Sequence, residues 1–562
     1  MPVRTQRGVT LGIAVLAVAA LVVVPLLKLC QVVFDDRHAA LTRVLHAPGL
    51  STALLHTCEL ACIVPAFSVP IGAAIALYLR RPEVPCRGLL RLGVLLPLIV
   101  PQFVLGYSWT QAYARAGFTD TVFGIRWDGL QGPVGVAVVM IAGAVPISFL
   151  LTTAGLATRA QPDLERAARV CGASSWTTLR TITLPLLRPV LAAAGILTFV
   201  AALENFAVPQ VLGTPAGYST ITTRIYGDLA LASDPQSFVD AVTLALGLVV
   251  VAAVVLLPTD LVLGPRLRTI RAAQSAGTLP AGRPNWHAAA PGVLVLAFLV
   301  AAVGLPTVAL VLASVTRAIG VAPTPSNWTL ANFRGALDAP TMSAIGHSLE
   351  LAACAACVLI VLGAVLCTLE RRRAGRALGT AAILTFAVPG STLGVGLLIA
   401  YGRWFDGSLG LILLAYLAKF WALAHRTLSA AVDRLPPAEA QAARCSGATP
   451  MTAVRTVWLP ALAPALLAGW LIVFVSALHE VTMSSLLYGP TSQTLAVAVL
   501  NSQELGAVGA TAALSVVLTA LLLVAAIPAA FGVRLAASRR NAPRRTPPRP
   551  VAARPREVVG VH

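Results

Sequence analysis

Two pairs of polar residues interrupt apolar segments that are otherwise suited to a membrane. Glu204 and Asn205 form one pair, and His479 and Glu480 form the other, at matching positions of two related segments. Charged groups inside a membrane are costly and tend to be functional. One interpretation is a polar lining of a translocation path for a cationic or metal-bearing solute. The alternative is structural, with these side chains forming hydrogen bonds between helices.

The chain lacks the motifs of several other kinds of chemistry. A phosphate-binding P-loop needs a lysine after glycine, but the two lysines, Lys28 and Lys419, follow Leu27 and Ala418. No H-E-x-x-H motif and no cysteine–histidine cluster with zinc spacing is found. Close pairs of cysteines inside apolar segments are interpreted as packing residues. We therefore assign no catalytic residue and no metal ligand, and we expect no cofactor in this chain.

The composition is that of a membrane protein. Of the 562 residues, 57% are hydrophobic and 11% are charged, whereas soluble domains carry about a quarter charged residues. Most of the surface is therefore expected to face lipid. The formal charge of +19 does not indicate a nucleic-acid partner, because the basic residues lie in short runs between apolar stretches and form no basic domain.

Apolar segments of about 20 residues predict membrane-spanning helices. We expect an all-α polytopic protein with about twelve spans: 8–28, 52–79, 89–109, 133–154, 190–212, 238–260, 291–315, 343–369, 378–400, 408–430, 465–487 and 506–530. The first span is too long for a cleaved signal peptide, so we interpret it as retained.

The placement of arginine predicts the orientation. With the N-terminus inside, 31 of the 39 arginines fall in cytoplasmic segments. The remaining eight fall in the outer loops. This bias indicates an even number of spans with both termini in the cytoplasm, in a cell (inner or plasma) membrane.

The chain repeats itself. His56 and Glu59 recur as His347 and Glu350, and Val100-Pro101 recurs as Val388-Pro389. We interpret the histidines and glutamates as structural groups at the membrane surface. Six spans in each copy imply two halves of the same orientation, related by an axis along the membrane normal. We place the first domain at 1–263, a cytoplasmic linker at 264–290, the second domain at 291–533 and an Arg/Pro-rich cytoplasmic tail at 534–562.

The most specific repeat is a cytoplasmic loop, at 155–188 in the first half and 431–463 in the second. Each copy has Ala-Ala-Arg-x-x-Gly, then nine residues, then Ile or Val, one residue, and Leu-Pro. Glycine permits the positive φ of a helix end, and proline begins the next helix. The pattern predicts a rigid helix–turn–helix elbow whose determinants are Glu165, Ala167, Ala168, Gly172, Leu184 and Pro185, and Glu439, Ala442, Ala443, Gly447, Leu459 and Pro460.

This loop resembles the EAA loop of binding-protein-dependent ABC importer permeases, and nearly the whole chain resembles two such permease domains fused together. The resemblance implies a type I ABC importer permease fold, in which each loop supplies a coupling helix that docks into an ATPase. It further implies two copies of an ABC ATPase, which hold the ATP and Mg, and an extracytoplasmic solute-binding protein as partners, besides membrane lipid.

One position departs from the family pattern. The glutamate expected directly before Ala-Ala is Arg166 in the first copy and Gln441 in the second. Acidic residues stand nearby, at Glu165 and Glu439. The charge of the docking surface therefore differs from that of the family, while its turn and its apolar positions are retained.

The solute is less well determined. Fused permeases of this layout most resemble the ferric iron permeases, so we expect ferric iron. Thiamine is the alternative, and polyamine and phosphonate systems share the loop. A secondary transporter driven by an ion gradient remains a different class of hypothesis, which the paired elbows disfavour.

Overall fold

A computed structural model describes most of the chain. The described residues are 19–35, 49–81, 83–159, 162–232, 234–268, 290–369, 388–432, 441–443 and 445–541, with residues 12, 16, 17, 42, 44, 46 and 385. Glu439, most of the predicted linker and the end of the predicted tail lie outside them. The described part of the tail belongs to a helix that continues to Asn541.

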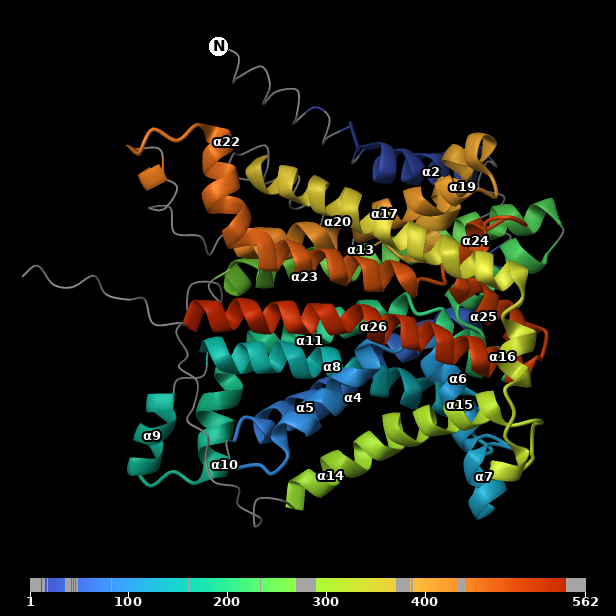
Figure 1. Cartoon of the computed structure of the whole chain (residues 1–562), viewed down its shortest axis with the longest axis horizontal. Coiled ribbons are helices and arrows are strands. Elements are labelled where there is room, and N and C mark those ends of the chain that lie inside the picture. The colour runs from blue at the N-terminus through green and yellow to red at the C-terminus, as the bar shows by residue number, and fades with distance from the viewer. Residues whose placement is uncertain are drawn as a thin grey trace, which may run out of the picture.

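The described residues form long apolar helices that lie side by side (Figure 1). Nine helical runs are long and apolar enough to cross a membrane: α4 (Leu50–Leu79), α8 (Pro133–Arg159), α10 to α11 (Ser175–Leu203), α13 (Pro235–Arg268), α14 to α15 (Ala290–Val315), α17 (Ala339–Leu369), α20 (Leu409–Val432), α22 to α23 (Pro450–Leu478) and α26 (Val508–Asn541). A tenth span is bent by 107° between Arg87–Leu98 and Gln102–Phe123. It contains α5 (Arg87–Leu95), α6 (Gln102–Tyr113) and α7 (Phe118–Phe123).

The all-α polytopic fold is confirmed, but three predicted spans differ. The third, predicted at 89–109, is not one straight helix, because it is bent by 107° between Leu98 and Gln102. The fifth and eleventh spans were predicted at 190–212 and 465–487, but α11 (Leu184–Leu203) and α23 (Leu459–Leu478) begin and end earlier. The first and ninth predicted spans lie partly outside the described residues. Their described parts are α2 (Val24–Asp35) with the π-turn η1 (Ala19–Val23), and α19 (Gly390–Phe405).

The two halves are joined by their first spans. In the first half, α2 packs against α13 of its own half and against α19 of the other half. In the second half, α15 (Leu305–Val315) packs in the same way against α26 and α6. Each first span therefore contacts the third span of the opposite half, so the halves are interlocked rather than merely adjacent.

A repeated defect in the first spans explains part of this contact. Each has a π-turn, η1 or η9 (Val300–Gly304), followed by a proline at the second position of the next helix, Pro25 or Pro306. A π-turn pairs a carbonyl with the N–H five residues later, and proline has no N–H. The carbonyls of Ala20 and Ala301 therefore lose their partner.

The opposite half supplies the missing donors. The Tyr113 hydroxyl donates to the Ala301 carbonyl at 2.6 Å, and the Tyr401 hydroxyl donates to the Ala20 carbonyl at 2.7 Å. A carbonyl inside a membrane has no water to bond. These matched hydrogen bonds therefore stabilise the contact between the halves at both of its pseudo-symmetric sites.

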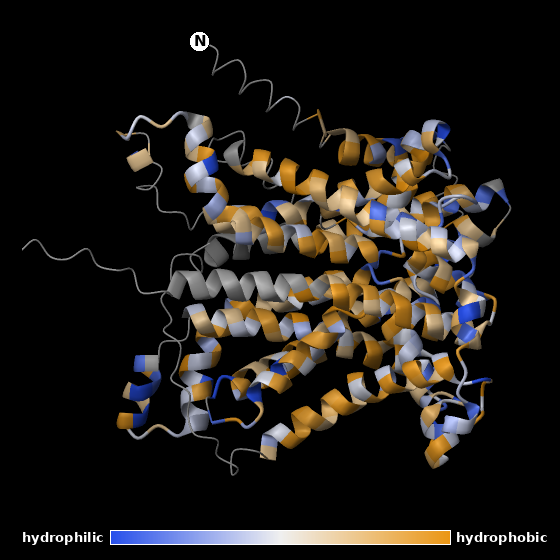
Figure 2. Ribbon diagram, in the orientation of Figure 1, coloured by the Kyte–Doolittle hydropathy of each residue, from blue (hydrophilic) through white to orange (hydrophobic). Residues whose placement is uncertain are grey.

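Polar groups gather at the two ends of the helices, and apolar residues dominate between them (Figure 2). At one end lie α9 (Pro162–Val170), α10 (Ser175–Thr178) and α22 (Pro450–Ala453) (Figure 1). We name this the elbow end, and the opposite end the far end. The far end carries short helices between the last two spans of each half, including α12 (Ile221–Tyr226) and α25 (Leu495–Glu504).

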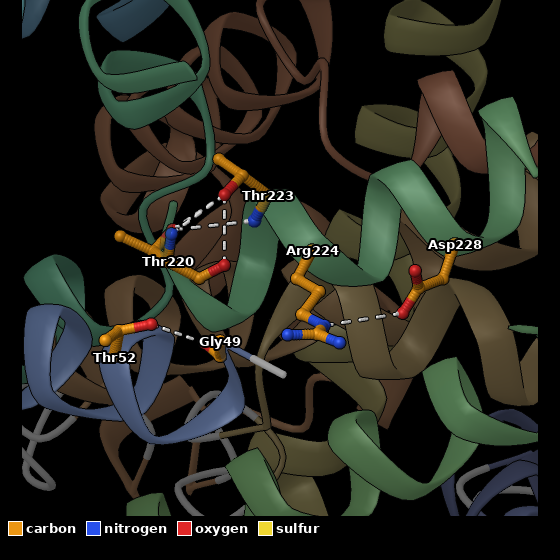
Figure 3. Close-up of polar contacts among 6 residues, drawn as sticks. All are labelled: Gly49, Thr52, Thr220, Thr223, Arg224 and Asp228. Carbon is orange, nitrogen blue, oxygen red and sulfur yellow. Dashed lines mark hydrogen bonds and ion pairs between the residues drawn. The ribbon is translucent and has the colours of Figure 1, made fainter. Parts of the chain in front are cut away.

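The far-end histidines make structural contacts. The ring Nδ1 of His56 lies 2.9 Å from the Ser219 carbonyl oxygen, and that of His347 lies 3.2 Å from the Gln493 carbonyl oxygen. Close by, Thr220 and Thr223 cap α12 reciprocally, and Arg224 pairs with Asp228 at 4.0 Å beside the start of α4 (Figure 3).

Tyr113→Phe is expected to lower the free energy of unfolding by about 1 kcal/mol, because it leaves the Ala301 carbonyl without a donor. The cost should be smaller in a Pro306→Ala background, because that change supplies a backbone N–H. Thermal unfolding of the two single variants and the double variant in detergent measures this coupling. Strictly additive effects would show that Tyr113 does not act through this carbonyl.

Candidate functional site: two elbows and the seam between the halves

The first elbow, residues 162–185, ends its leading helix with a Schellman motif. Gly172 has φ of 85°, its N–H donates to the Arg169 carbonyl at 3.0 Å, and the Ala173 N–H donates to the Ala168 carbonyl at 2.9 Å. Only glycine adopts this φ without cost. The glycine of the signature therefore ends α9 as predicted, and Ala168 supplies the carbonyl that closes the motif.

The second elbow, residues 437–460, repeats this geometry where it is described. Gly447 has φ of 77°, and the Ala448 N–H donates to the Ala443 carbonyl at 3.0 Å. The next helix begins with equivalent caps in the two copies: Ser174 accepts from the Thr177 N–H at 3.1 Å, and Thr449 accepts from the Thr452 N–H at 3.2 Å. The two loops therefore have the same turn and the same cap.

The Leu-Pro of each signature begins the next helix, as predicted. Pro185 and Pro460 occupy the second positions of α11 and α23. A feature not predicted precedes each of them, a π-turn at η3 (Leu179–Thr183) and η11 (Val454–Trp458). Figure 1 shows α22 lying across the direction of α23. The π-turn and the proline together mark the place where the elbow joins the span.

Glu165 faces its own chain. Its carboxylate accepts from Arg80 at 2.9 Å, just after the end of α4, and from the Thr183 hydroxyl at 3.0 Å. Arg166, which replaces the family's glutamate, makes only an exposed pair with Asp163 at 3.4 Å among the described contacts. Glu165 therefore braces the first elbow between two spans.

The elbows expose apolar side chains at equivalent positions. Trp176 is 67% exposed and Met451, 275 positions later, is 68% exposed. Ala167 and Ala442 are exposed, and Ala168 and Ala443 are half-buried. The two elbows therefore present a large apolar side chain at the same place beside the same turn.

The polar pairs that follow the fifth and eleventh spans lie after the helices rather than inside them. Glu204 and His479 are the residues directly after α11 and α23. The Asn205 side chain accepts from the Val208 N–H at 3.1 Å. The Glu480 carboxylate accepts from the Met483 N–H at 2.9 Å and from the Ser484 N–H at 3.0 Å. Asn205 and Glu480 therefore cap the same turn in the two halves.

Glu204 contacts the opposite half of the chain. Its carboxylate pairs with Lys419 of α20 at 2.5 Å, across the boundary between the halves. Lys419 also donates to the Val388 carbonyl at 3.0 Å. We name this group, Glu204, Val388 and Lys419, the seam cluster. The signal for it was present, because a lysine inside a span needs a partner.

Among the residues that the structure describes, no three His, Cys, Asp or Glu side chains lie close enough to hold a metal ion. The seam cluster is therefore an ion pair with capped backbone rather than a preformed metal cage.

Comparisons with known proteins agree with the paired architecture. The sequence family described as binding-protein-dependent transport system inner membrane component matches residues 68–264 and again residues 359–539. The ferric transport system permease protein FbpB of Actinobacillus pleuropneumoniae is 26% identical over 476 residues, covering 81% of this chain and 67% of that protein.

Two further relatives each match about a third of the chain. The molybdenum transport system permease protein ModB of Mycobacterium tuberculosis is 33% identical over 214 residues, covering 37% of this chain and 78% of that protein. The putrescine transport system permease protein PotI of Escherichia coli (strain K12) is 30% identical over 180 residues, covering 30% and 64%. The two family matches span more than half of the chain, which therefore belongs to the binding-protein-dependent transport system inner membrane components, as a fused permease that carries the family's domain twice.

Proposed function

We propose that this chain is the permease of an importer that moves ferric iron into the cytoplasm. An external binding protein delivers the solute, and two ATPase subunits drive the cycle by docking on the two elbows. The observation that carries the proposal is the pair of elbows, which share one turn and one cap and lie at the same end of a single chain (Figure 1). The family is described as an inner membrane component of binding-protein-dependent transport systems, so we assign ATP hydrolysis to the separate subunits.

The docking surface that we propose is apolar and basic. Trp176 and Met451 are exposed at equivalent positions, and the exposed charges beside them include Arg166, Arg180 and Arg455. Glu165 is engaged with Arg80 and offers no free carboxylate. We infer that the partner cleft presents an apolar pocket with an acidic rim, and that the fit depends on the turn and on packing more than on a glutamate of this chain.

The orientation follows from the same proposal. The elbow end lies in the cytoplasm together with both termini, the linker at 264–290 and the tail at 534–562, which agrees with the arginine distribution. The domains at 1–263 and 291–533 each contribute one elbow. The far end then receives the binding protein.

We also propose that the solute passes along the boundary between the halves, near Glu204, Asn205, His479 and Glu480. Asn205 and Glu480 shape the turns there through their backbone caps. Glu204 and His479 occupy equivalent positions beside these turns and supply the groups that differ between the halves.

Ferric iron is favoured among the solutes because a ferric permease matches this chain over most of its length as a fused protein, whereas the molybdenum and putrescine relatives each match about a third of it. Thiamine, polyamines, phosphonate and molybdate are the alternatives. An ion-driven carrier would need no ATPase and gives no role to the elbows.

Gly172→Pro and Gly447→Pro are each expected to abolish ATP-driven uptake. Proline requires φ near −65°, whereas these glycines have φ of 85° and 77°. The measurement is solute uptake by vesicles that contain the complete transporter. Gly172→Asn is the matched control, because asparagine tolerates the left-handed region, and it should retain most activity. Full uptake in the proline variants would contradict coupling through the elbows.

The solute assignment predicts uptake of radioactive ferric iron by proteoliposomes that contain the chain, its ATPase and its binding protein. Uptake should require ATP on the side of the membrane where the elbows and the ATPases lie. It should persist when the ion gradients are removed. Parallel assays with thiamine, putrescine and molybdate test the alternatives. Transport of one of these without transport of iron would replace iron as the solute, and uptake by the chain alone would refute the importer.

A further inference from the structure

The seam cluster joins the helices that carry the two elbows. Glu204 is the residue after α11, the helix that begins at the first elbow. Lys419 lies inside α20, the helix that leads towards the second elbow. Their side chains are 21% and 10% exposed and form the ion pair at 2.5 Å. This contact therefore connects the two elbow-bearing helices far from the elbows themselves.

The ion pair has no equivalent on the other side of the pseudo-symmetric structure. The repeat offset of 275 positions places His479 opposite Glu204 and Ala144 opposite Lys419. The backbone around these positions is the same, because Asn205 and Glu480 cap equivalent turns. His479 Nδ1 has no hydrogen-bond partner among the described residues. The two halves therefore have the same backbone turn after the fifth and eleventh spans, but they carry different side chains there.

Lys419 also contacts the backbone directly before α19. Pro389 is the N-cap of α19 and has an extended ψ of 143°, so the Val388 carbonyl precedes the helix and lies outside its hydrogen-bond ladder. Lys419 donates to this carbonyl at 3.0 Å. One ammonium group therefore connects the end of α11 in the first half with the start of α19 and with α20 in the second.

A contact of this kind favours a closed boundary. Opposite charges attract strongly where water is excluded and weakly where water enters. When α11 separates from α20, each charge loses its partner, and the unpaired charge raises the free energy until water solvates it. The pair is therefore stable in a dry, closed seam and loses its advantage once the seam is open and hydrated.

We propose that the Glu204–Lys419 ion pair is a positioning contact that keeps the two halves closed at the seam between transport events and that opens in each cycle. The proposal rests on the proposed function, because it requires that movement of the elbows separates the halves. It assigns to Lys419 a role in coupling: without the pair, the elbows move more freely and ATP is hydrolysed without solute.

The test uses the complete transporter in proteoliposomes, with ATP hydrolysis measured in the absence of solute-loaded binding protein. Glu204→Gln and Lys419→Gln should each raise this basal hydrolysis by about five- to tenfold, the size of a typical coupling effect. Uptake per ATP should fall. The double variant, Glu204→Gln with Lys419→Gln, should raise basal hydrolysis no further than the single variants, because both changes remove the same contact.

Arg126→Gln is the matched control. Arg126 forms an exposed ion pair with Asp128 inside the first half, so its loss should leave basal hydrolysis unchanged. Glu204→Gln keeps a hydrogen-bond acceptor for Lys419, so it serves if Lys419→Gln fails to fold. Basal hydrolysis within about twofold of wild type in folded Glu204→Gln would overturn the proposal, and so would a folded double variant whose increase is the product of the two single increases. ATP-driven uptake by wild type in the same vesicles separates these failures from failure of the proposed function.

Discussion

A backbone carbonyl inside a membrane must find a donor within the protein, and this chain places prolines where helices lose one. Pro25 and Pro306 follow π-turns, and tyrosines of the opposite half bond the carbonyls of Ala20 and Ala301. Pro389 is the N-cap of α19, and Lys419 donates to the Val388 carbonyl directly before it. The same defects that interrupt single helices therefore create the contacts that join the two halves.

The elbows and the seam are connected through the spans. The first elbow continues through η3 into α11, and Glu204 is the residue directly after α11. In the proposed cycle, movement of the first elbow is transmitted along α11 and changes the position of Glu204 relative to α20. Because the halves are fused in one chain, equivalent positions can carry different residues. Glu204 and Lys419 form the ion pair, whereas the equivalent positions are occupied by His479 and Ala144.

Much of the fold could be predicted from the sequence because the length of the apolar segments reflects the membrane directly. The glycine of each elbow and the proline that begins the next helix were also predictable, since few residues suit those conformations. The π-turns and the interlocked first spans were not predictable, because they depend on contacts between segments far apart in the chain. The inward role of Glu165 depends likewise on Arg80, 85 positions away.

If one chain has two equivalent docking surfaces, as we propose, it should bind two separate ATPase subunits. The direct measurement is the mass of the intact complex purified through this chain with its ATPase under non-denaturing conditions. We expect two ATPase subunits for each chain of the wild type. We expect one ATPase subunit for each chain of a variant in which Trp176 and Gly172 of the first elbow are both substituted. A chain that binds no ATPase, or that still binds two after this replacement, would contradict the proposal.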